Sequence, residues 1–568
     1  MRYSYPVFFG FFLILFGTCL PLLGQKANPG FDEKFDHWPE KLKIGGTVIL
    51  GGGGELPRQA DAAFVSATGK NKQVVAVVFQ PNSPAKKDSA ETISDLEEKF
   101  ASAKSVSVLP IGPSQTSLTD EALGELTSAN GLWIVADHGT TESQDKAIQQ
   151  LLTSAAELVD RGGIVCVNGK LTERLGQHAV VKANDLFAGT NIIPDTILKT
   201  DFNDKDRGGL MSALAKHERC VGIGICPNTA VVLRGRQMRL YGDEAATFCL
   251  ADSDKHPERI KQLKRAKSRR ANRYDTVFDL TAWRREAIER TVDLFPAKEP
   301  PKPVLENGTL MIVGGGRTPS RLLNLMVEVA GGKEARMVYI PCSESDQVAE
   351  PRAMLAYWKR KGVKSATWIH TKDRQKANSD EELLAALRNA TGIWFGGGRQ
   401  WNFVDSYYGT EAHRLMKDVL ARGGVIGGSS AGASVLGRYM CRANPVANFD
   451  IMAPGYERGL GFIGGVAIDQ HFSQRNRQKD MTQLADRYPQ LLGLGIDEST
   501  AMVVSKSTAH IVGKGKVYFY DRTRPVVKGE PDYIALGSGA KYDLDKRKVL
   551  VSDRKPKAAE TPPTKKTE

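Results

Sequence analysis

The sequence predicts an α/β protein made of two tandem domains, each with a doubly wound parallel sheet. Short apolar runs alternate with longer helical patterns, as in sheets that helices cover on both faces. The segment 46–57 (GTVILGGGGELP) recurs as 308–319 (GTLMIVGGGRTP). Two further pairs of segments keep the same offset of about 261 residues: 131–135 with 392–396, and 161–165 with 422–426. A repeat this long indicates a duplicated domain and not a solenoid unit.

The composition is that of an ordinary globular protein. The chain has 568 residues, of which 41% are hydrophobic and 25% charged, which excludes a disordered or fibrous protein. The net charge is +13, but the basic residues concentrate in 256–273 and in the tail from Lys541. Because they do not interleave with aromatic residues, we interpret them as solvated charge and expect no nucleic-acid partner. An anionic partner is a minor alternative.

The N-terminus predicts a secretory signal over residues 1–24. A short basic start precedes an apolar run at 6–23, and the small residue Gly24 marks the expected cut. An uncleaved membrane anchor is the alternative, because the run approaches the length that spans a bilayer. A lipoprotein cut before Cys19 is disfavoured by Thr18. We therefore expect a secreted or periplasmic protein with no membrane contact beyond this segment.

Composition also predicts the domain boundaries. Residues 25–43 form a polar approach, followed by a first domain at 44–296. The Pro-rich, charged linker 297–303 should be extended, and a second domain follows at 304–544. The basic tail 545–568 is predicted to be disordered. Six cysteines follow the signal segment; they include no CxxC pair, so disulfides and buried free thiols are both open.

In the second copy, four apolar runs that end in Gly, Pro or Ser are predicted strands: 310–313, 337–340, 392–395 and 424–426. Helical patterns are expected after them, for example at 319–330 and 410–422. In such sheets, ligands bind at the carboxyl ends of the strands. The candidate catalytic residues all lie at such ends.

The first candidate is Ser430, within Gly428-Ser-Ser-Ala-Gly432. Between a strand and a helical run, this is the nucleophile elbow pattern G-x-S-x-G, in which the amide of Ala431 would face an oxyanion. A Gly/Ser segment can also be a simple turn. However, the first copy has Gly169 at the position of Ser430, so the strand recurs and the elbow does not.

The second candidate is His471, which follows the strand-like run 465–468. A lone histidine is more often structural. The matching stretch of the first copy, 201–203, has no histidine, which favours a functional role. As general base, His471 would take the proton of Ser430 and return it to the leaving amine.

A third polar strand end carries Asp497 and Glu498. A catalytic base needs an acceptor that orients it and stabilises the imidazolium. Either carboxylate could supply this. The first copy, which lacks the serine and the histidine, also has Pro227 at the position of Glu498, which favours a functional role. A carboxylate that caps a turn is the structural alternative.

A glycine-rich loop follows the run 392–395, where the chain reads Gly396-Gly-Gly398-Arg-Gln400. Glycine lets backbone amides approach a reacting carbonyl closely, so the amide of Gly398 is a candidate second oxyanion donor. Phosphate binding is a weaker alternative, because no Walker lysine or serine follows.

Four motifs within the second domain resemble cyanophycinase: the elbow 428–433, the segments 469–477 (DQHFSQRNR) and 495–501 (GIDESTA), and the Gly-Gly-x-Gln loop at 397–400. That enzyme belongs to a family of serine exopeptidases that includes aspartyl dipeptidase and has a class I glutamine-amidotransferase-like fold. The resemblance implies a catalytic triad of Ser430, His471 and Glu498. The first copy resembles the family only in its scaffold.

The resemblance further implies which residues surround a substrate built from β-linked aspartate and arginine: Gln400, Asp469, Gln470, Arg475 and Arg477. No cofactor and no metal are expected. Cyanophycinases commonly have a further arginine a few residues later, where this chain reads Gln478-Lys-Asp480.

The sequence thus predicts an exported serine-type exopeptidase that resembles cyanophycinase. The alternatives are a dipeptidase or isopeptidase on other Asp-containing peptides, and a non-catalytic binding protein of the same fold. The first domain should be catalytically silent. Since two related domains on a short linker commonly pack about a pseudo-twofold axis, an intramolecular pseudo-dimer is expected.

Overall fold

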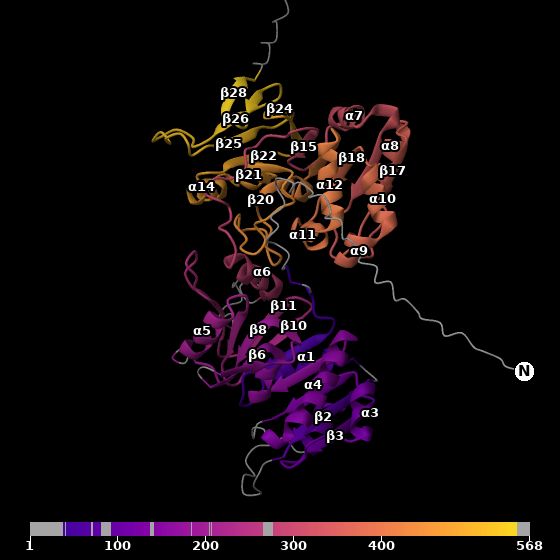
Figure 1. Ribbon diagram of the computed structural model, residues 1–568, viewed down its shortest axis with the longest axis vertical. Helices are drawn as coiled ribbons and strands as arrows, with labels where there is room; N and C mark the ends of the chain where they lie inside the picture. The colour runs from indigo at the N-terminus through magenta and orange to yellow at the C-terminus, as the bar shows by residue number, and fades with distance from the viewer. Residues whose placement is uncertain are drawn as a thin grey trace, which may run out of the picture. The chain divides into compact units, whose positions relative to one another are not determined.

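The computed structural model describes residues 38–39, 41–69, 72–80, 93–136, 141–182, 185–203, 205, 207–264 and 277–553 (Figure 1). The predicted signal segment and residues 554–568 of the predicted tail lie outside this part. Across the described ranges, no helix is both long enough and apolar enough to cross a membrane.

The first half of the chain alternates strands and helices, with these bounds: β1 (Thr47–Gly51), α1 (Arg58–Thr68), β2 (Gln73–Phe79), α2 (Ile93–Lys99), β3 (Ser105–Ile111), α3 (Asp120–Ser128), β4 (Gly131–Val135), η2 (Glu142–Gln144), α4 (Asp145–Asp160), β5 (Ile164–Asn168), η3 (Gly169–Leu175), β6 (Gly176–Lys182), β7 (Asp185–Ala188), β8 (Ile193–Lys199), α5 (Arg207–Lys216), β9 (Val221–Ile225), β10 (Thr229–Arg234), β11 (Gln237–Gly242), β12 (Ala246–Leu250), β13 (Arg259–Leu263), β14 (Val277–Asp279) and α6 (Leu280–Arg290).

The second half has these elements: β15 (Thr309–Val313), α7 (Ser320–Val329), η6 (Gly332–Glu334), β16 (Arg336–Ile340), α8 (Arg352–Arg360), β17 (Ser365–Trp368), α9 (Arg374–Ser379), α10 (Glu381–Asn389), β18 (Gly392–Phe395), α11 (Trp401–Tyr407), α12 (Glu411–Ala421), β19 (Val425–Ser429), α13 (Ala431–Ser434), β20 (Gly437–Met440), β21 (Ile463–Gln470), η7 (Ser473–Arg475), α14 (Gln478–Arg487), β22 (Leu492–Ile496), β23 (Thr500–Ser505), β24 (Thr508–Gly513), β25 (Val517–Tyr520), β26 (Ile534–Leu536), β27 (Lys541–Asp543) and β28 (Lys548–Val551).

The main sheets of the two halves have the same strand order. The first runs β3-β2-β4-β5-β1-β10-β11-β14, and the second runs β17-β16-β18-β19-β15-β23-β24-β27-β28. In both, the first five strands pair in parallel and the next two pair antiparallel. The predicted α/β class with parallel sheets is therefore confirmed.

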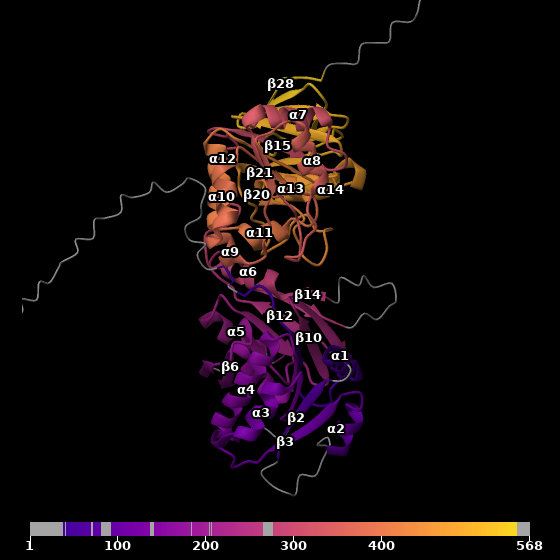
Figure 2. The ribbon, with the colours of Figure 1, turned by 90° about the vertical axis from the view of Figure 1, so that its right-hand side faces the viewer.

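Helices cover both faces of the second main sheet, as a doubly wound fold requires. Along β15, Leu310 and Ile312 belong to the core beneath α10 and α12, whereas Met311 and Val313 belong to the core beneath α7 and α8. Figure 2 shows α10 and α12 on one side of the strands and α8 on the other. A strand buried on both faces reads as a continuous apolar run, which is why β15 could be predicted from the sequence.

Each half also contains a second sheet, which the sequence analysis did not anticipate. The orders are β13-β12-β9-β8-β6-β7 and β20-β21-β22-β25-β26. The strands β6-β8-β9-β12 correspond to β20-β21-β22-β25 in order and in the direction of pairing. Glycines are frequent in β21 and β22, which weakens their apolar pattern and explains why only their polar ends were noticed.

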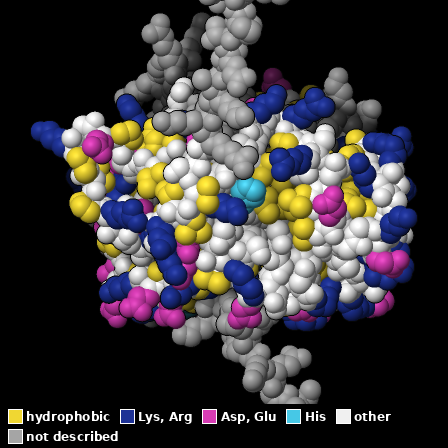
Figure 3. Space-filling model, turned by 90° about the horizontal axis from the view of Figure 1, so that it is seen from above, with side chains coloured by type: hydrophobic (Ala, Val, Ile, Leu, Met, Phe, Trp, Pro, Cys, Tyr) yellow, Lys and Arg dark blue, Asp and Glu magenta, His cyan; other side chains and the backbone are white. Residues whose placement is uncertain are grey.

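The predicted disorder of residues 545–568 is wrong for the start of that segment. Lys548–Val551 forms β28, which pairs antiparallel with β27. The run Val549-Leu-Val551 is rich in residues that favour strands, and the neighbouring basic residues masked this signal. On the face seen in Figure 3, Lys and Arg side chains are dispersed among hydrophobic and uncharged ones.

Candidate active site

Ser430 lies at a sharp turn between β19 and α13. Its backbone adopts φ 57° and ψ −117°, a conformation that L-residues rarely adopt. The amide of Ser430 donates to the carbonyl of Val313 on β15, at 3.0 Å, which fixes the turn against the neighbouring strand. The half-buried hydroxyl is thereby held at the carboxyl end of the main sheet.

His471 follows β21 and brings its ring to this hydroxyl. Its Nε2 lies 2.8 Å from Ser430 Oγ, and its Nδ1 lies 2.5 Å from Glu498 Oε1. The backbone of His471 has φ 51° and donates to the carbonyl of Gly314 at 2.7 Å. The structure therefore joins a hydroxyl, an imidazole and a carboxylate from three strand ends in one hydrogen-bonded chain.

The pKa of His471 is lowered from its ordinary value. Burial is the main cause, because it disfavours the charged imidazolium. The hydrogen bond that the imidazole donates to Glu498 opposes this by raising the pKa, whereas the positive charge of Arg475 lowers it further. A ring that stays neutral to mildly acidic pH is suited to accept a proton.

The two carboxylates that the sequence left open have different surroundings. Glu498 reaches His471, as described above. Asp497 instead accepts backbone hydrogen bonds from Ser473 at 2.9 Å and Lys516 at 3.0 Å. Asp497 therefore ties the loop after β21 to the loop before β25 and does not contact the imidazole.

A glycine loop after β15 packs directly on this chain of residues. A Cβ on Gly315 would fall 2.6 Å from His471 Nε2, and one on Gly316 would fall 3.0 Å from the Cβ of Glu498. Both glycines have positive φ, 107° and 65°. This role could not be predicted from the sequence, because glycines that both copies share indicate only a common scaffold.

The glycine loop after β18 approaches Ser430 from another side. A Cβ on Gly397 would lie 3.5 Å from the Cβ of Ser430 and 4.0 Å from its Oγ. A Cβ on Gly398, the residue selected from the sequence, would meet the side chain of Cys342 at 2.9 Å. The structure therefore adds Gly397 as a neighbour of the nucleophile. Ala431, the other selected amide, directly follows Ser430 and is fully buried.

Four of the five residues predicted to surround the substrate are buried: Gln400, Asp469, Gln470 and Arg477. Asp469 has no exposed surface and accepts from Arg477 at 2.9 Å and from Arg442 at 2.9 and 3.0 Å. Arg477 also donates to Gln470 Oε1 at 3.1 Å. Gln400 donates to the carbonyl of Cys441 at 2.6 Å. These side chains form a polar layer whose hydrogen bonds are made within the protein.

Arg442 belongs to this layer and was missed by the sequence analysis. Besides Asp469, it binds Asp480 at 2.6 Å. Asp480 lies in the segment where cyanophycinases commonly have a further arginine, so here a carboxylate occupies that segment and an arginine from another loop pairs with it. No local pattern marks Arg442, because its partners lie 27 and 38 residues away.

Arg475 differs from the other predicted residues. Its side chain is exposed and forms no hydrogen bond or ion pair with any described residue. Its backbone amide donates to the carbonyl of His471 at 3.2 Å, and its charge lowers the pKa of His471. Arg475 is thus available to an anionic group near Ser430.

The corresponding strand ends of the first half carry different residues. Gly169, at φ 76°, follows β5 where Ser430 follows β19. Asp201, at φ 48°, replaces His471, and its amide donates to the carbonyl of Gly52 at 2.8 Å. Pro227 stands at the position of Glu498. The backbone geometry is shared, but the hydroxyl and the imidazole are absent from these positions.

The second half of the chain matches known peptidases. The profile of Peptidase family S51 matches residues 309–512, which contain Ser430, His471 and Glu498. The chain is 32% identical over 222 residues to a cyanophycinase of Synechococcus elongatus, an alignment that covers 38% of this chain and 68% of that protein. It is 27% identical over 219 residues to a cyanophycinase of Geminocystis herdmanii (strain PCC 6308), with 38% and 80% covered.

Among solved structures, a peptidase from an acI-B1 Actinobacterium is 21% identical, with a TM-score of 0.32, and the match covers 42% of this chain and 97% of that one. The family assignment rests on the sequence relatives, since the first cyanophycinase is more than two thirds covered. The chain belongs to peptidase family S51 and is a serine peptidase similar to the cyanophycinases.

Proposed function

We propose that this protein is an exported exopeptidase that hydrolyses peptides containing aspartate and arginine, with Ser430 as its nucleophile. The observation that carries the proposal is the continuous hydrogen-bonded chain from Ser430 through His471 to Glu498, at 2.8 and 2.5 Å. Relatives named cyanophycinase support the substrate class.

In the first half-reaction, Ser430 Oγ attacks the scissile carbonyl while His471 Nε2 takes its proton. The tetrahedral intermediate collapses, the C–N bond breaks, and His471 returns the proton to the leaving amine. A water molecule then repeats the sequence on the acyl-enzyme and releases the acid. Glu498 keeps the imidazole oriented and stabilises its charged form.

The oxyanion would be held by backbone amides on two sides of Ser430. One is the amide of Ala431, at the start of α13, and the other belongs to the loop 396–398. Donors that are fixed before the reaction need no reorganisation as charge develops. The strained turn at Ser430 supports this role, because strain at a nucleophile is a form of preorganisation.

Arg475 is the residue that we propose to bind a substrate carboxylate. In a β-Asp-Arg unit the arginine has a free α-carboxylate, which lies near the aspartyl main-chain bond that must break to release the dipeptide. A guanidinium with no other partner can bind such a group through two parallel hydrogen bonds. The other four residues would support the site without binding the substrate directly, because their polar atoms already bond to one another or to the backbone: Asp469, Gln470, Arg477 and Gln400.

The decisive experiment is release of β-Asp-Arg from cyanophycin by the purified protein, compared with a panel of Asp-containing dipeptides and isopeptides. We expect β-Asp-Arg from the polymer, and none from Ser430→Ala. Cleavage of the panel but not of the polymer would favour the dipeptidase or isopeptidase alternative. Binding without cleavage of any substrate would favour a non-catalytic binding protein.

We further propose that residues 1–24 direct export and that the first half arose by duplication and lost its catalytic residues. The shared strand order and the matching backbone at Gly169 and Asp201 support the duplication. N-terminal sequencing of the protein produced in a Gram-negative host would test the export proposal. A mature chain that begins near Gln25 is expected, and retention of Met1 would argue for an uncleaved anchor.

A further inference from the structure

A buried cluster of charges joins the two halves of the chain, which belong to one compact unit. At its centre lies Asp405 of α11, in the second half, which is 1% exposed. Its carboxylate accepts from Arg236 at 2.6 Å and from Arg285 at 3.0 Å, both from the first half. Arg285 has no exposed surface. Charges buried this completely are kept in a fold only when they are paired.

Two more residues complete the cluster. Asp279 of the first half forms a two-pronged pair with Arg236, at 2.7 and 2.9 Å. Tyr456 of the second half donates to Asp405 at 2.8 Å. The two guanidinium groups thus face two carboxylates, and the ammonium of Lys372, 5.8 Å from the ring of Trp401, adds a further positive charge near Asp405. Burial alone would raise the pKa of Asp405, but Arg236 and Arg285 lower it, so this carboxyl stays ionised.

Aromatic rings hold the two arginines in place. Arg236 lies 4.6 Å above the ring of Trp401, the first residue of α11. Arg285 lies 3.9 Å from the ring of Tyr456. Arg236 therefore contacts α11 at two points, Trp401 and Asp405, one turn apart, which fixes the direction of the helix as well as its position.

The helix that these arginines hold leads into the active site. The loop 396–398, whose Gly397 lies beside Ser430, ends two residues before α11 begins. Between them, Gln400 is tied to the carbonyl of Cys441. A shift of α11 would therefore move the loop relative to the nucleophile.

We infer that Asp405 is a positioning residue: by pairing with Arg236 and Arg285 of the first half, it holds α11 so that the loop 396–398 meets the oxyanion formed at Ser430. The inference rests on the proposed function. It gives the first half a role in catalysis although Gly169, Asp201 and Pro227 stand where the second half has its serine, histidine and glutamate. Displacement by about 1 Å is enough to reduce turnover about 100-fold.

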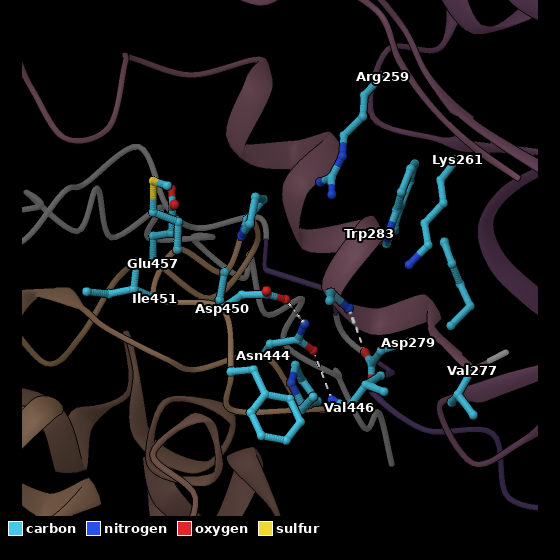
Figure 4. Close-up of a pocket in the computed structure, with 18 of the residues that line it drawn as sticks. Arg259, Lys261, Val277, Asp279, Trp283, Asn444, Val446, Asp450, Ile451 and Glu457 are labelled. Carbon is cyan, nitrogen blue, oxygen red and sulfur yellow. Dashed lines mark hydrogen bonds between the residues drawn. The ribbon is translucent and has the colours of Figure 1, made fainter. Parts of the chain in front are cut away.

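Asp279, which lines a cavity beside the cluster, offers a matched control for Asp405. The cavity has a volume of about 690 Å³, and its lining includes Asp279 and Trp283 of the first half and Asn444 and Asp450 of the second (Figure 4). Asp279 therefore borders space that water can enter, and it contacts Arg236 but not α11. Loss of the Asp279 charge should weaken the same cluster but leave the hydrogen bond between Arg285 and Asp405 intact.

The test compares Asp405→Asn with Asp279→Asn in the full-length protein. We measure the rate at which a serine-directed phosphonate labels Ser430, together with kcat, KM and the unfolding midpoint. Asp405→Asn should label about 10- to 100-fold more slowly, with kcat reduced in parallel and KM changed less than about 3-fold. Asp279→Asn should lower the unfolding midpoint similarly but label within about 3-fold of wild type.

A second variant covers the case in which Asp405→Asn does not fold. Arg285→Met leaves Asp405 its bonds to Arg236 and Tyr456, and should still slow labelling about 3- to 10-fold. Equal labelling of wild type and the folded variants of Asp405 or Arg285, or an equal loss in Asp279→Asn, would overturn the inference. If wild type itself is not labelled, the proposed serine mechanism fails, and the inference fails with it.

Discussion

The imidazole of His471 rests directly on Gly315, with no room between them for a side chain. A Cβ on Gly315 would fall 2.6 Å from Nε2 and would sit on a backbone with φ 107°. Any larger residue at this position must displace the ring from Ser430 or the glycine loop from β15. A glycine of the repeated motif thus lies directly against the proposed general base.

Gly315→Ala should reduce kcat by about 100-fold or more, because the added methyl group moves the general base away from Ser430. The first half offers a matched control in Gly53→Ala, where a Cβ would fall 2.5 Å from Asp201 Oδ1 on a backbone with φ 101°. Both variants should lose stability, and only the first should lose activity. Full activity of a folded Gly315→Ala protein would show that His471 is not the base.

Ser430→Ala should lower kcat by at least about 10⁴-fold while changing the unfolding midpoint by no more than about 2 °C, since the hydroxyl is half-buried and packs on no core. Ser429→Ala, next to it on the chain, is the control and should stay within a few-fold of wild type. An active Ser430→Ala protein would end the serine mechanism.

The pH dependence should report the titration of His471. Because burial and Arg475 lower its pKa, kcat/KM should fall only as the pH drops below the ordinary imidazole value of about 6.5. Glu498→Gln removes the group that raises this pKa, so the midpoint should move to still lower pH, and kcat should fall about 10²- to 10⁴-fold.

Asp497→Asn is the comparison for this profile. It leaves His471 and its partner untouched, so the midpoint should not move. If Asp497→Asn were inactive while Glu498→Gln stayed fully active, Asp497 and not Glu498 would be the residue that orients His471.

Arg475→Gln should raise KM for substrates with a free α-carboxylate and lower kcat/KM about 10- to 100-fold, the cost of losing a charge-assisted hydrogen bond. It should also move the pH midpoint upward, because the positive charge that lowers the pKa of His471 is gone. Arg475→Lys keeps the positive charge but cannot form the two parallel hydrogen bonds of a guanidinium. Its pH midpoint should therefore be nearer to the wild-type value than its KM is. An unchanged KM in Arg475→Gln would place the carboxylate elsewhere.

The second half expressed alone, as residues 304–544, should be poorly soluble or inactive. It would lack Arg236 and Arg285, the two arginines that pair with Asp405 and hold α11. Size-exclusion chromatography and phosphonate labelling measure the outcome. A monomeric, fully active fragment would contradict a positioning role for the first half.

The parts of the fold that could be predicted from sequence are those with local signals. The run Leu310–Val313 is apolar because both faces of β15 are buried, and Ser430 stands out because an elbow needs small residues at fixed spacing. Such signals need only a few consecutive residues. The sheet order of each half, by contrast, depends on pairings that no short segment encodes.

The residues that escaped prediction act over long separations. Arg442 pairs with Asp469, which is 27 residues away in the sequence, and Arg236 pairs with Asp405, which is 169 residues away. Neither arginine has a neighbour in sequence that marks it as buried or paired. Asp497 and Glu498 show the same limit at short range: adjacent carboxylates look alike in a sequence, and only the fold turns one to the imidazole and the other to backbone amides.

The pairing of Asp405 with two arginines of the first half also bears on how this protein can change. Each half contributes ions whose partners lie in the other, so neither half is an interchangeable module. In a chimera whose first half came from a relative without both arginines, Asp405 would lose its two guanidinium partners. Substitutions at Arg236, Arg285 and Asp405 are therefore tolerable chiefly in combination. We expect the two halves of the chain to evolve together at these three positions.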